Sequence, residues 1–215
     1  VQTCALPISK IKPFNDVRVR KALNYAVNKE ALAKVAFSGY AVPATGSAPE
    51  GVDYAKVYEP WPYDPKKARE LLKEAGYPNG FTATLWSLYN HTTAQKVIQF
   101  LQQQYARIGV KLQVRALEAG QRVTLVQSVG PEKSTSQMFC WGWSASTGEL
   151  DWVLRPLLAT SSFPPANSNY AYYSNPKLDS LLTAALKTTD RAEKTKIYDE
   201  AQELIWKDAP WVFLV

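Results

Sequence analysis

Apolar residues recur every three or four positions over the first part of the chain, which is the spacing of amphipathic helices. Residues 15–27 carry one such apolar face, and residues 28–39 carry a second, with Asn28 placed to cap its first turn. The members of the two faces are Val19, Leu23, Ala26 and Val27, and then Leu32, Val35 and Ala36. Residues 40–63 contain several prolines and show no period, so we expect a long loop or extended arm there.

Residues 64–116 add a third helix and then a strand, a helix and a strand. Asp64-Pro65 predicts the start of the third helix, because Asp caps a first turn in which proline is tolerated. Residues 81–88 are rich in β-formers, Thr92 with Gln95 predicts a capping box for a helix that closes at Gly109, and residues 110–116 alternate as a strand. Such a unit connects parallel neighbours of one sheet, which indicates an α/β fold.

The rest of the chain continues the alternation of helices and strands. We expect a short helix over residues 121–128, a strand buried on both faces over residues 138–143, and a last strand from Pro210. Asn175-Pro176 and the pair Asp190 and Glu193 predict the starts of two further helices. No period of 20 to 50 residues recurs, so one α/β lobe is the economical interpretation.

Composition and charge exclude several classes of protein. With 215 residues, 46% of them hydrophobic, the chain can bury a large core and is not disordered. The formal charge is +6, but the basic residues are interspersed with acids, so we expect no nucleic-acid partner. Two cysteines and one histidine are too few for a structural zinc site, and we expect neither a metal nor a cofactor.

The sequences at the two ends of the chain do not fit the pattern of the rest. Residues 1–9, VQTCALPIS, match the translation of a common sequencing adapter, so we expect them not to be native and set them aside in predicting the fold. The apolar run Trp211–Val215 resembles a strand with no turn after it. We therefore expect residues 13–215 to be a partial lobe, truncated at both ends.

Enzymatic chemistry finds little support. Gly142-Trp143-Ser144-Ala145-Ser146 is similar to the nucleophile elbow of α/β-hydrolases but lacks its last glycine, and His91 precedes Ser144 where that fold places its histidine later. A serine hydrolase using Ser144 stays open as an alternative, but we expect no catalytic residue. Glu149 and Asp151 are interpreted as acids at a helix start, and Cys140 as buried packing.

Aromatic residues gather where ligands bind in open α/β sheets. Trp86 and Tyr89 lie at the carboxyl end of one predicted strand, and Trp141 and Trp143 lie at the end of another. Small polar residues follow both strands: Asn90, His91, Ser144, Ser146 and Thr147. An aromatic wall with a few directional polar groups predicts a pocket that binds a small polar solute without transforming it.

Four segments carry a resemblance to a known family: PFNDVRVRKALNYAVNKEALAK, WPYDPKKARELLKEAGYPNG, TLWSLYNHTTAQKVIQFLQQQ and MFCWGWSASTGELDW. Through them the chain resembles the second, carboxyl-terminal lobe of the peptide and nickel family (family 5) of solute-binding proteins for ATP-binding-cassette importers. The resemblance implies a type II periplasmic-binding-protein-like lobe, a mixed sheet flanked by helices. It also implies a monomeric periplasmic receptor that closes on glutathione or a short peptide and delivers it to an inner-membrane permease with its ATPase.

The resemblance further implies where the solute lies. Dipeptide-binding relatives hold the ligand's amino group with an aspartate at a position that falls near Ser146, and its carboxylate with an arginine where this chain has Tyr89-Asn90-His91. Both departures weaken a dipeptide assignment, although a dipeptide or oligopeptide receptor stays the alternative within the family. The expected ligand-binding residues are Asn90, His91, Trp143, Ser144, Ser146 and Thr147.

Overall fold

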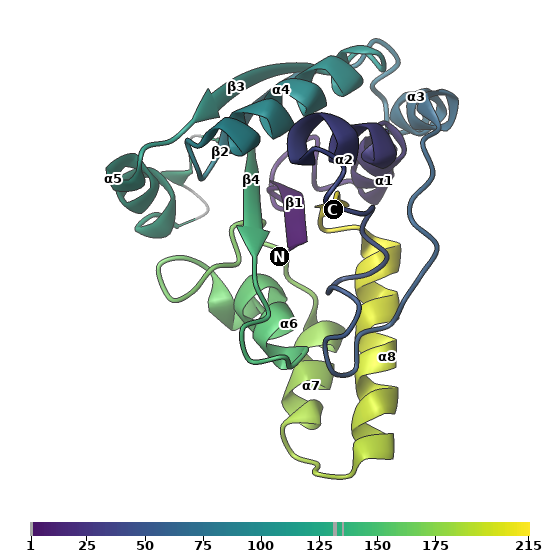
Figure 1. Ribbon diagram of the computed structural model, residues 1–215, viewed down its shortest axis with the longest axis vertical. Coiled ribbons are helices and arrows are strands. Elements are labelled where there is room, and N and C mark those ends of the chain that lie inside the picture. The colour runs from purple at the N-terminus through teal and green to yellow at the C-terminus, as the bar shows by residue number, and fades with distance from the viewer. Residues whose placement is uncertain (1, 131–132, 135) are drawn as a thin grey trace.

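Five strands form one mixed sheet between two groups of helices (Figure 1). The computed structural model describes residues 2–130, 133–134 and 136–215. The strands are β1 (Gln2–Pro7), β2 (Thr82–Ser87), β3 (Lys111–Ala116), β4 (Met138–Trp143) and β5 (Val212–Phe213), in the spatial order β3-β2-β4-β1-β5. β2 runs parallel to β3 and β4, whereas β1 runs antiparallel to β4 and β5. The predicted α/β class, with a mixed sheet flanked by helices, is confirmed.

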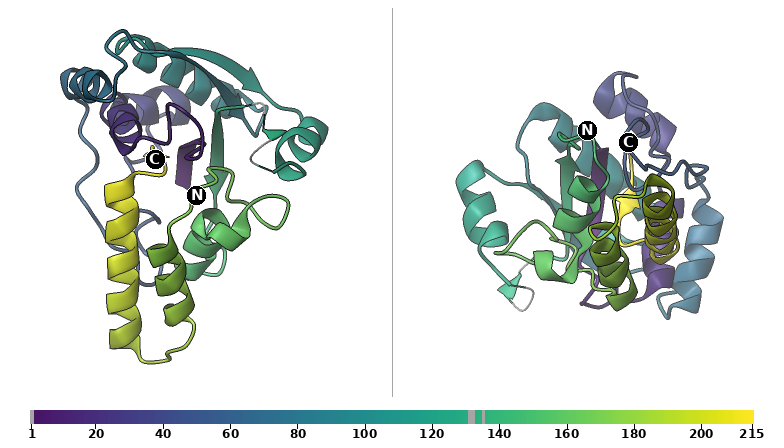
Figure 2. Two further views of the ribbon diagram at one scale, coloured as in Figure 1. Left: turned by 180° about the vertical axis from the view of Figure 1, so that it is seen from behind. Right: turned by 90° about the horizontal axis from the view of Figure 1, so that it is seen from below.

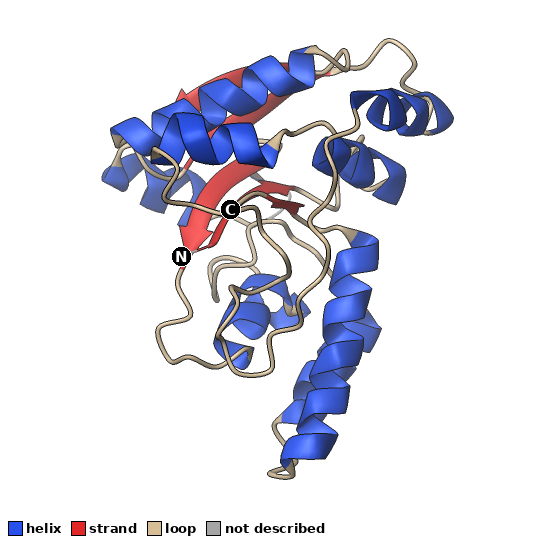
Figure 3. Ribbon diagram, turned by 45° about the vertical axis from the view of Figure 1, so that its right-hand side comes forward, coloured by secondary structure: helices blue, strands red, loops and turns tan. Residues whose placement is uncertain are grey.

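Helices from the first half of the chain cover one face of the sheet. They are α1 (Val17–Tyr25), α2 (Lys29–Phe37), α3 (Pro65–Glu74) and α4 (Thr92–Ala106). Their apolar faces pack on the sheet residues Ala83, Leu85 and Met138 in one hydrophobic cluster. In Figure 3 these are the blue helices in the upper part of the molecule, in front of and beside the red strands.

The opposite face of the sheet is covered by helices from the second half. α6 (Asp151–Leu158), a 3-10 turn (Thr160–Ser162), α7 (Pro176–Ala185) and α8 (Arg191–Asp208) build a second hydrophobic cluster around Phe139 and Phe213. α7 and α8 lie side by side and extend away from the sheet as a helical hairpin (Figures 1 and 2). Because helices cover both faces, the inner strands bury side chains on both sides.

The side chains of β4 alternate between the two hydrophobic clusters. Met138 and Cys140 belong to the cluster under α1–α4, whereas Phe139 belongs to the cluster under α6–α8. The prediction of a strand buried on both faces is therefore confirmed for its first three residues. Trp141, Gly142 and Trp143 are only half-buried, because the strand emerges from the helical layers at its carboxyl end.

Helix caps are the local signals that the structure confirms most directly. The side chains of Asn28, Asp64, Asn175 and Asp190 each accept a hydrogen bond from a backbone N–H in the first turn of α2, α3, α7 and α8. The acids near the start of α6 are also placed as expected, with Asp151 as its first residue and paired to Arg155 at 2.7 Å. These caps satisfy donors that have no partner inside the helix.

Several details of the sequence prediction are wrong. Val35 is 55% exposed, so the buried face of α2 is narrower than predicted. The helix expected over residues 121–128 is a short α5 (Ala119–Arg122) that continues as a π-helical turn (Val123–Gln127). The last strand is confined to Val212–Phe213 instead of beginning at Pro210.

Residues 2–7, which we set aside in the fold prediction, form β1 inside the sheet. Ala5 faces the cluster under α1–α4, while Cys4 and Leu6 face the cluster under α6–α8. Both Cys4 and Cys140 are buried free thiols. That residues 1–9 are foreign to the natural protein stays a prediction.

The arm over residues 40–63 has no helix or strand, as predicted, and α8 holds it through a buried amide. Gln202 is fully buried, and its Oε1 accepts a hydrogen bond from the backbone N of Lys56 at 2.9 Å. Its Nε2 donates to the carbonyl of Tyr54 at 2.9 Å. On the surface, Lys56 pairs with Glu203 at 2.9 Å.

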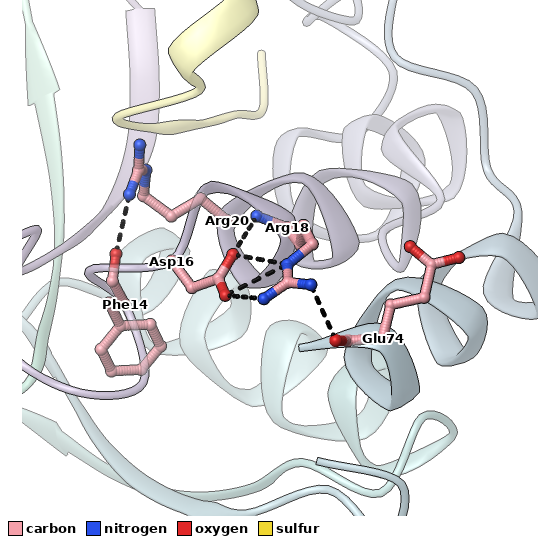
Figure 4. A network of polar contacts seen from close by, with 5 residues as sticks. All are labelled: Phe14, Asp16, Arg18, Arg20 and Glu74. Atoms are coloured by element: carbon pink, nitrogen blue, oxygen red, sulfur yellow. Dashed lines mark hydrogen bonds and ion pairs between the residues drawn. The ribbon is translucent and has the colours of Figure 1, made fainter. Parts of the chain in front are cut away.

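Two arginines of α1 join that helix to distant segments (Figure 4). Arg18 pairs with Asp16 at 2.6 Å and donates to the carbonyl of Glu74, at the end of α3, at 2.8 Å. Arg20 is buried and donates to the carbonyl of Phe14 at 2.9 Å. It also donates to the carbonyls of Asp208 and Ala209, at 2.7 to 3.2 Å, where α8 ends and the chain turns into β5.

Candidate functional site

The candidate site lies where β2 and β4 end. These parallel strands pair directly, with Ser87 opposite Cys140, so the segments that follow them leave the sheet at the same edge. The backbone N of Leu88 donates to the carbonyl of Cys140 at 3.0 Å and extends the contact by one residue. The structure thus brings the two predicted ligand loops, residues 88–91 and 144–148, to one edge of the sheet.

An aromatic pair occupies the centre of this edge. The indole Nε1 of Trp141 donates to the hydroxyl of Tyr89 at 2.7 Å, and that hydroxyl donates to the carbonyl of Gly142 at 3.4 Å. The ring of Tyr89 also stacks on His91, with centroids 5.5 Å apart. Trp141, like Trp86, is half-buried, so neither ring belongs wholly to the core.

A cavity of about 290 Å³ opens beside this pair. Its walls come from α2, the first turns of α4 and the ends of β2 and β4: Phe37, Ser87, Tyr89, His91, Thr93, Ala94, Val97, Cys140, Trp141 and Gly142. Of the six predicted ligand-binding residues, only His91 lines it. Burial raises the pKa of the Cys140 thiol to about 12, so this cavity wall carries a protonated, unreactive sulfur at neutral pH.

His91 is also the N-cap of α4, which corrects the predicted capping box of Thr92 and Gln95. Its Nδ1 accepts a hydrogen bond from the backbone N of Ala94 at 3.2 Å, so Nδ1 carries no proton. In this state Nε2 carries the ring proton and is the donor left for a ligand. Gln95 does not reach back to the cap, because its Nε2 donates to the Asn90 side chain at 2.9 Å.

Asn90 joins the loop after β2 to the segment after β3. Its Nδ2 donates to the carboxylate of Glu118, and its Oδ1 accepts from Gln95. Both ends of the amide are therefore engaged, and a ligand that contacts Asn90 has to share it with these partners. Glu118 and Gln121 form the capping box that begins α5.

Trp143 extends the aromatic wall beyond β4. Its Nε1 donates to the carbonyl of Trp152 at 2.9 Å, and its ring lies 5.2 Å from Trp141 and 6.1 Å from Trp152, measured between centroids. The polar atom of the indole is thus satisfied inside the protein. What Trp143 offers a ligand is a partly exposed aromatic surface.

The three hydroxyl residues after Trp143 lie in an exposed turn. Gly148, with φ +75°, closes this turn, and its N–H donates to the carbonyl of Ala145 at 2.9 Å. Thr147 accepts from the backbone N of Glu149 at 3.3 Å. Within the described ranges the hydroxyls of Ser144 and Ser146 have no hydrogen bond inside the protein and can turn toward a ligand.

No catalytic or metal arrangement emerges from the described part of the chain. Ser144 has no hydrogen-bonded imidazole there, and no group of three or more His, Cys, Asp or Glu side chains is placed to hold a metal ion. Likewise, none of the helices that the structure describes is long and apolar enough to cross a membrane.

The α/β fold and the aromatic site at the ends of β2 and β4 define a class of solute-binding proteins. Comparison with known proteins shows the family. The family described as bacterial extracellular solute-binding proteins, family 5 middle, matches residues 8–165, and the chain belongs to it. Its structural neighbours are periplasmic binding proteins of type II, which confirms the predicted fold class.

Curated relatives give a more particular likeness. The chain is 64% identical over 203 residues to the glutathione-binding protein GsiB of Pectobacterium atrosepticum, and 60% identical over 204 residues to that of Salmonella typhimurium. These alignments cover 94% and 95% of this chain but 40% of each relative. The relatives are named as binding proteins, in agreement with the expectation that the chain is no enzyme.

Solved structures extend the likeness to peptide-bound proteins. The chain superposes on the periplasmic binding protein DppA of Helicobacter pylori, in complex with the peptide STSA, with a TM-score of 0.86 and 32% identity. It superposes on a dipeptide-binding protein of Pseudoalteromonas, in complex with Met-Leu, with a TM-score of 0.88 and 28% identity. Each match covers 99% of this chain and 41% or 42% of the other.

Proposed function

We propose that the protein containing this chain is a periplasmic receptor that binds glutathione and delivers it to an ATP-binding-cassette importer. The observation that carries the proposal is the 64% identity, over 203 residues, to a protein named for glutathione binding. The family description as extracellular solute-binding proteins supports the compartment. An inner-membrane permease and its ATPase are the partners that such a receptor serves.

The site would bind the solute without chemistry. Tyr89, Trp141 and Trp143 form an aromatic wall on which apolar parts of a peptide-like solute can lie. The hydroxyls of Ser144 and Ser146 and the Nε2 of His91 supply hydrogen bonds for its amides. In this proposal Asn90 and Thr147 complete the set of ligand contacts, and the second lobe closes over the solute by a hinge motion.

The direct test is ligand-induced stabilisation of the full-length protein. Thermal unfolding is measured with reduced glutathione, oxidised glutathione, dipeptides and nickel, each at the same concentration. A ligand at 100 times its dissociation constant stabilises by about 2.7 kcal/mol, which raises the midpoint by several degrees. A shift with dipeptides but not with glutathione would replace the proposal by a dipeptide receptor of the same family.

Ser146→Asp tests the specificity of the exposed turn. A carboxylate at this position attracts the amino group that both solutes carry and repels carboxylates, of which glutathione has two and a simple dipeptide only one. We expect glutathione affinity to fall on the order of tenfold and dipeptide affinity to rise, measured by calorimetric titration. Ser146→Asn is the matched control, because it has the size of Asp without the charge; equal effects of both variants would contradict this prediction.

A further inference from the structure

A cation lies beside the aromatic pair of the candidate site. The Cζ atom of Arg122 lies 5.8 Å from the centroid of the Tyr89 ring, the same ring on which His91 stacks. The Nε atom of Arg122 is buried and has no hydrogen-bond partner, and the residue forms no ion pair within the described part of the chain. The one acid of α5's capping box, Glu118, is engaged by Asn90 instead.

The local structure holds Arg122 at this edge from both sides. Before it, the backbone N of Leu117 donates to the carbonyl of Ser87 at 2.9 Å, and Glu118 ties the start of α5 to the loop after β2. After it, the π-helical turn is closed by the bond from the N of Ser128 to the carbonyl of Val123 at 3.0 Å, and Val126 is buried. Turns of π-helix occur often at functional sites.

The chemistry of the guanidinium suits one kind of ligand group. Its Nε and one Nη form a planar fork of N–H donors that matches the two oxygens of a carboxylate. A buried donor without an acceptor is unfavourable, and a carboxylate bound at Nε would relieve it. The loop after β2 offers no such cation, since it carries Tyr89, Asn90 and His91.

We propose that Arg122 anchors a carboxylate of the bound solute and selects for solutes that carry one. This inference rests on the proposed function and adds the charged contact that the sequence analysis did not find. Both carboxylates of glutathione and the carboxyl terminus of a short peptide are suitable partners. Their esters and amides are not, because they lack the negative charge that the fork pairs with.

The test compares Arg122→Met with Arg115→Met in the full-length protein. Arg115 is a matched control, since its guanidinium also lies over a ring, 5.4 Å from the centroid of Trp86, but on the exposed part of β3. The probes are reduced glutathione and its diethyl ester, titrated calorimetrically. We expect Arg122→Met to weaken glutathione binding on the order of 10- to 100-fold and to leave ester binding unchanged. Arg115→Met is expected to change neither.

Other outcomes overturn the inference. Equal weakening of acid and ester would assign Arg122 a structural role, and no weakening would remove it from the site. Should Arg122→Met fail to fold, Arg122→Lys keeps the charge without the fork and is expected to weaken glutathione binding relative to the wild type while leaving ester binding unchanged. If the wild type binds alanyl-alanine and not glutathione, the glutathione proposal fails, and the same comparison of the dipeptide with its amide decides the role of Arg122.

Discussion

The ammonium group of Lys29 lies in the interior, at the start of α2. The residue is 4% exposed, and Nζ donates to the carbonyls of Asn24 at 2.8 Å and Trp61 at 3.1 Å. Desolvation by burial lowers the pKa of this amine from its ordinary 10.5 to about 7. The folded protein therefore releases this proton near neutrality, whereas the unfolded chain keeps it until much higher pH.

This difference predicts how stability depends on pH. Between pH 7 and 10 the unfolded chain binds up to one more proton at Lys29 than the folded chain does, so the free energy of unfolding rises with pH, by up to about 1.4 kcal/mol per pH unit from this group. Lys29→Met removes that rise, and Lys34→Met, exposed on the same helix, retains it. Urea unfolding at pH 6.5, 7.5 and 8.5 measures the slopes. A Lys29→Met slope equal to that of the wild type would refute the lowered pKa.

At the same scale, single residues show which parts of the candidate site have a signal in the sequence and which do not. His91 was predicted because it is polar and follows a strand, and the structure places it in the cavity wall. Phe37, in α2, also lines that wall, although it lies 50 positions before Ser87 in the chain. No local sequence pattern indicates that α2 contacts this edge of the sheet. Arg122 was not predicted because tertiary contacts, among them the hydrogen bond between Asn90 and Glu118, bring α5 to this edge, and no local sequence pattern indicates them.

At the scale of elements, caps and apolar faces were predictable because both depend on neighbours within one turn. The starts of α2, α3, α7 and α8 follow from one side chain each. The capping box predicted at the start of α4 was wrong, because the Gln95 side chain donates to Asn90 and does not bond to the cap residue. The pairing of strands across the sheet was harder to predict from the sequence, because β1 lies between β4 and β5, which are far from it along the chain.

The two arginines of α1 predict unequal costs of substitution. Arg20→Met leaves the carbonyls of Phe14, Asp208 and Ala209 without their buried donor, and we expect a loss of about 2–4 kcal/mol in the free energy of unfolding. Arg18→Met breaks an ion pair whose arginine side chain is 46% exposed and screened by solvent, so we expect the smaller loss of the two. Urea unfolding of both variants checks the order; equal losses would contradict it.

At the scale of the whole molecule, the arm over residues 40–63 joins the two sides of the sheet. It leaves α2, packs Ala44, Ala48 and Trp61 into the cluster under α6–α8, and returns to α3. Gln202 binds the arm from α8, so the arm's position depends on a buried amide in another element.

Removing this amide should release the arm without unfolding the lobe. We expect Gln202→Leu to cost about 1–3 kcal/mol, because the N–H of Lys56 and the carbonyl of Tyr54 lose their partner, and to speed proteolytic cleavage within residues 40–63. Glu203→Gln weakens the exposed ion pair with Lys56, and another within α8 with Lys207, but leaves the buried amide in place, so it serves as the control. Limited proteolysis with mass spectrometry locates the cuts. Unchanged cleavage in Gln202→Leu would show that other contacts hold the arm.

The pairing of β4 has a consequence for the candidate site. β2 pairs with β4 only from Met138 to Cys140, whereas Trp141, Gly142 and Trp143 pair with residues 2–4 of β1. The strand end that carries the aromatic wall is thus held by main-chain bonds to a segment that we predict to be foreign. These hydrogen bonds depend on the backbone of the paired segment and not on its side chains, as in peptide recognition by strand addition. Residues 2–7 therefore fill the place of a strand between β4 and β5, with Ala5 on one face and Cys4 and Leu6 on the other, and the position of the aromatic wall depends on that strand.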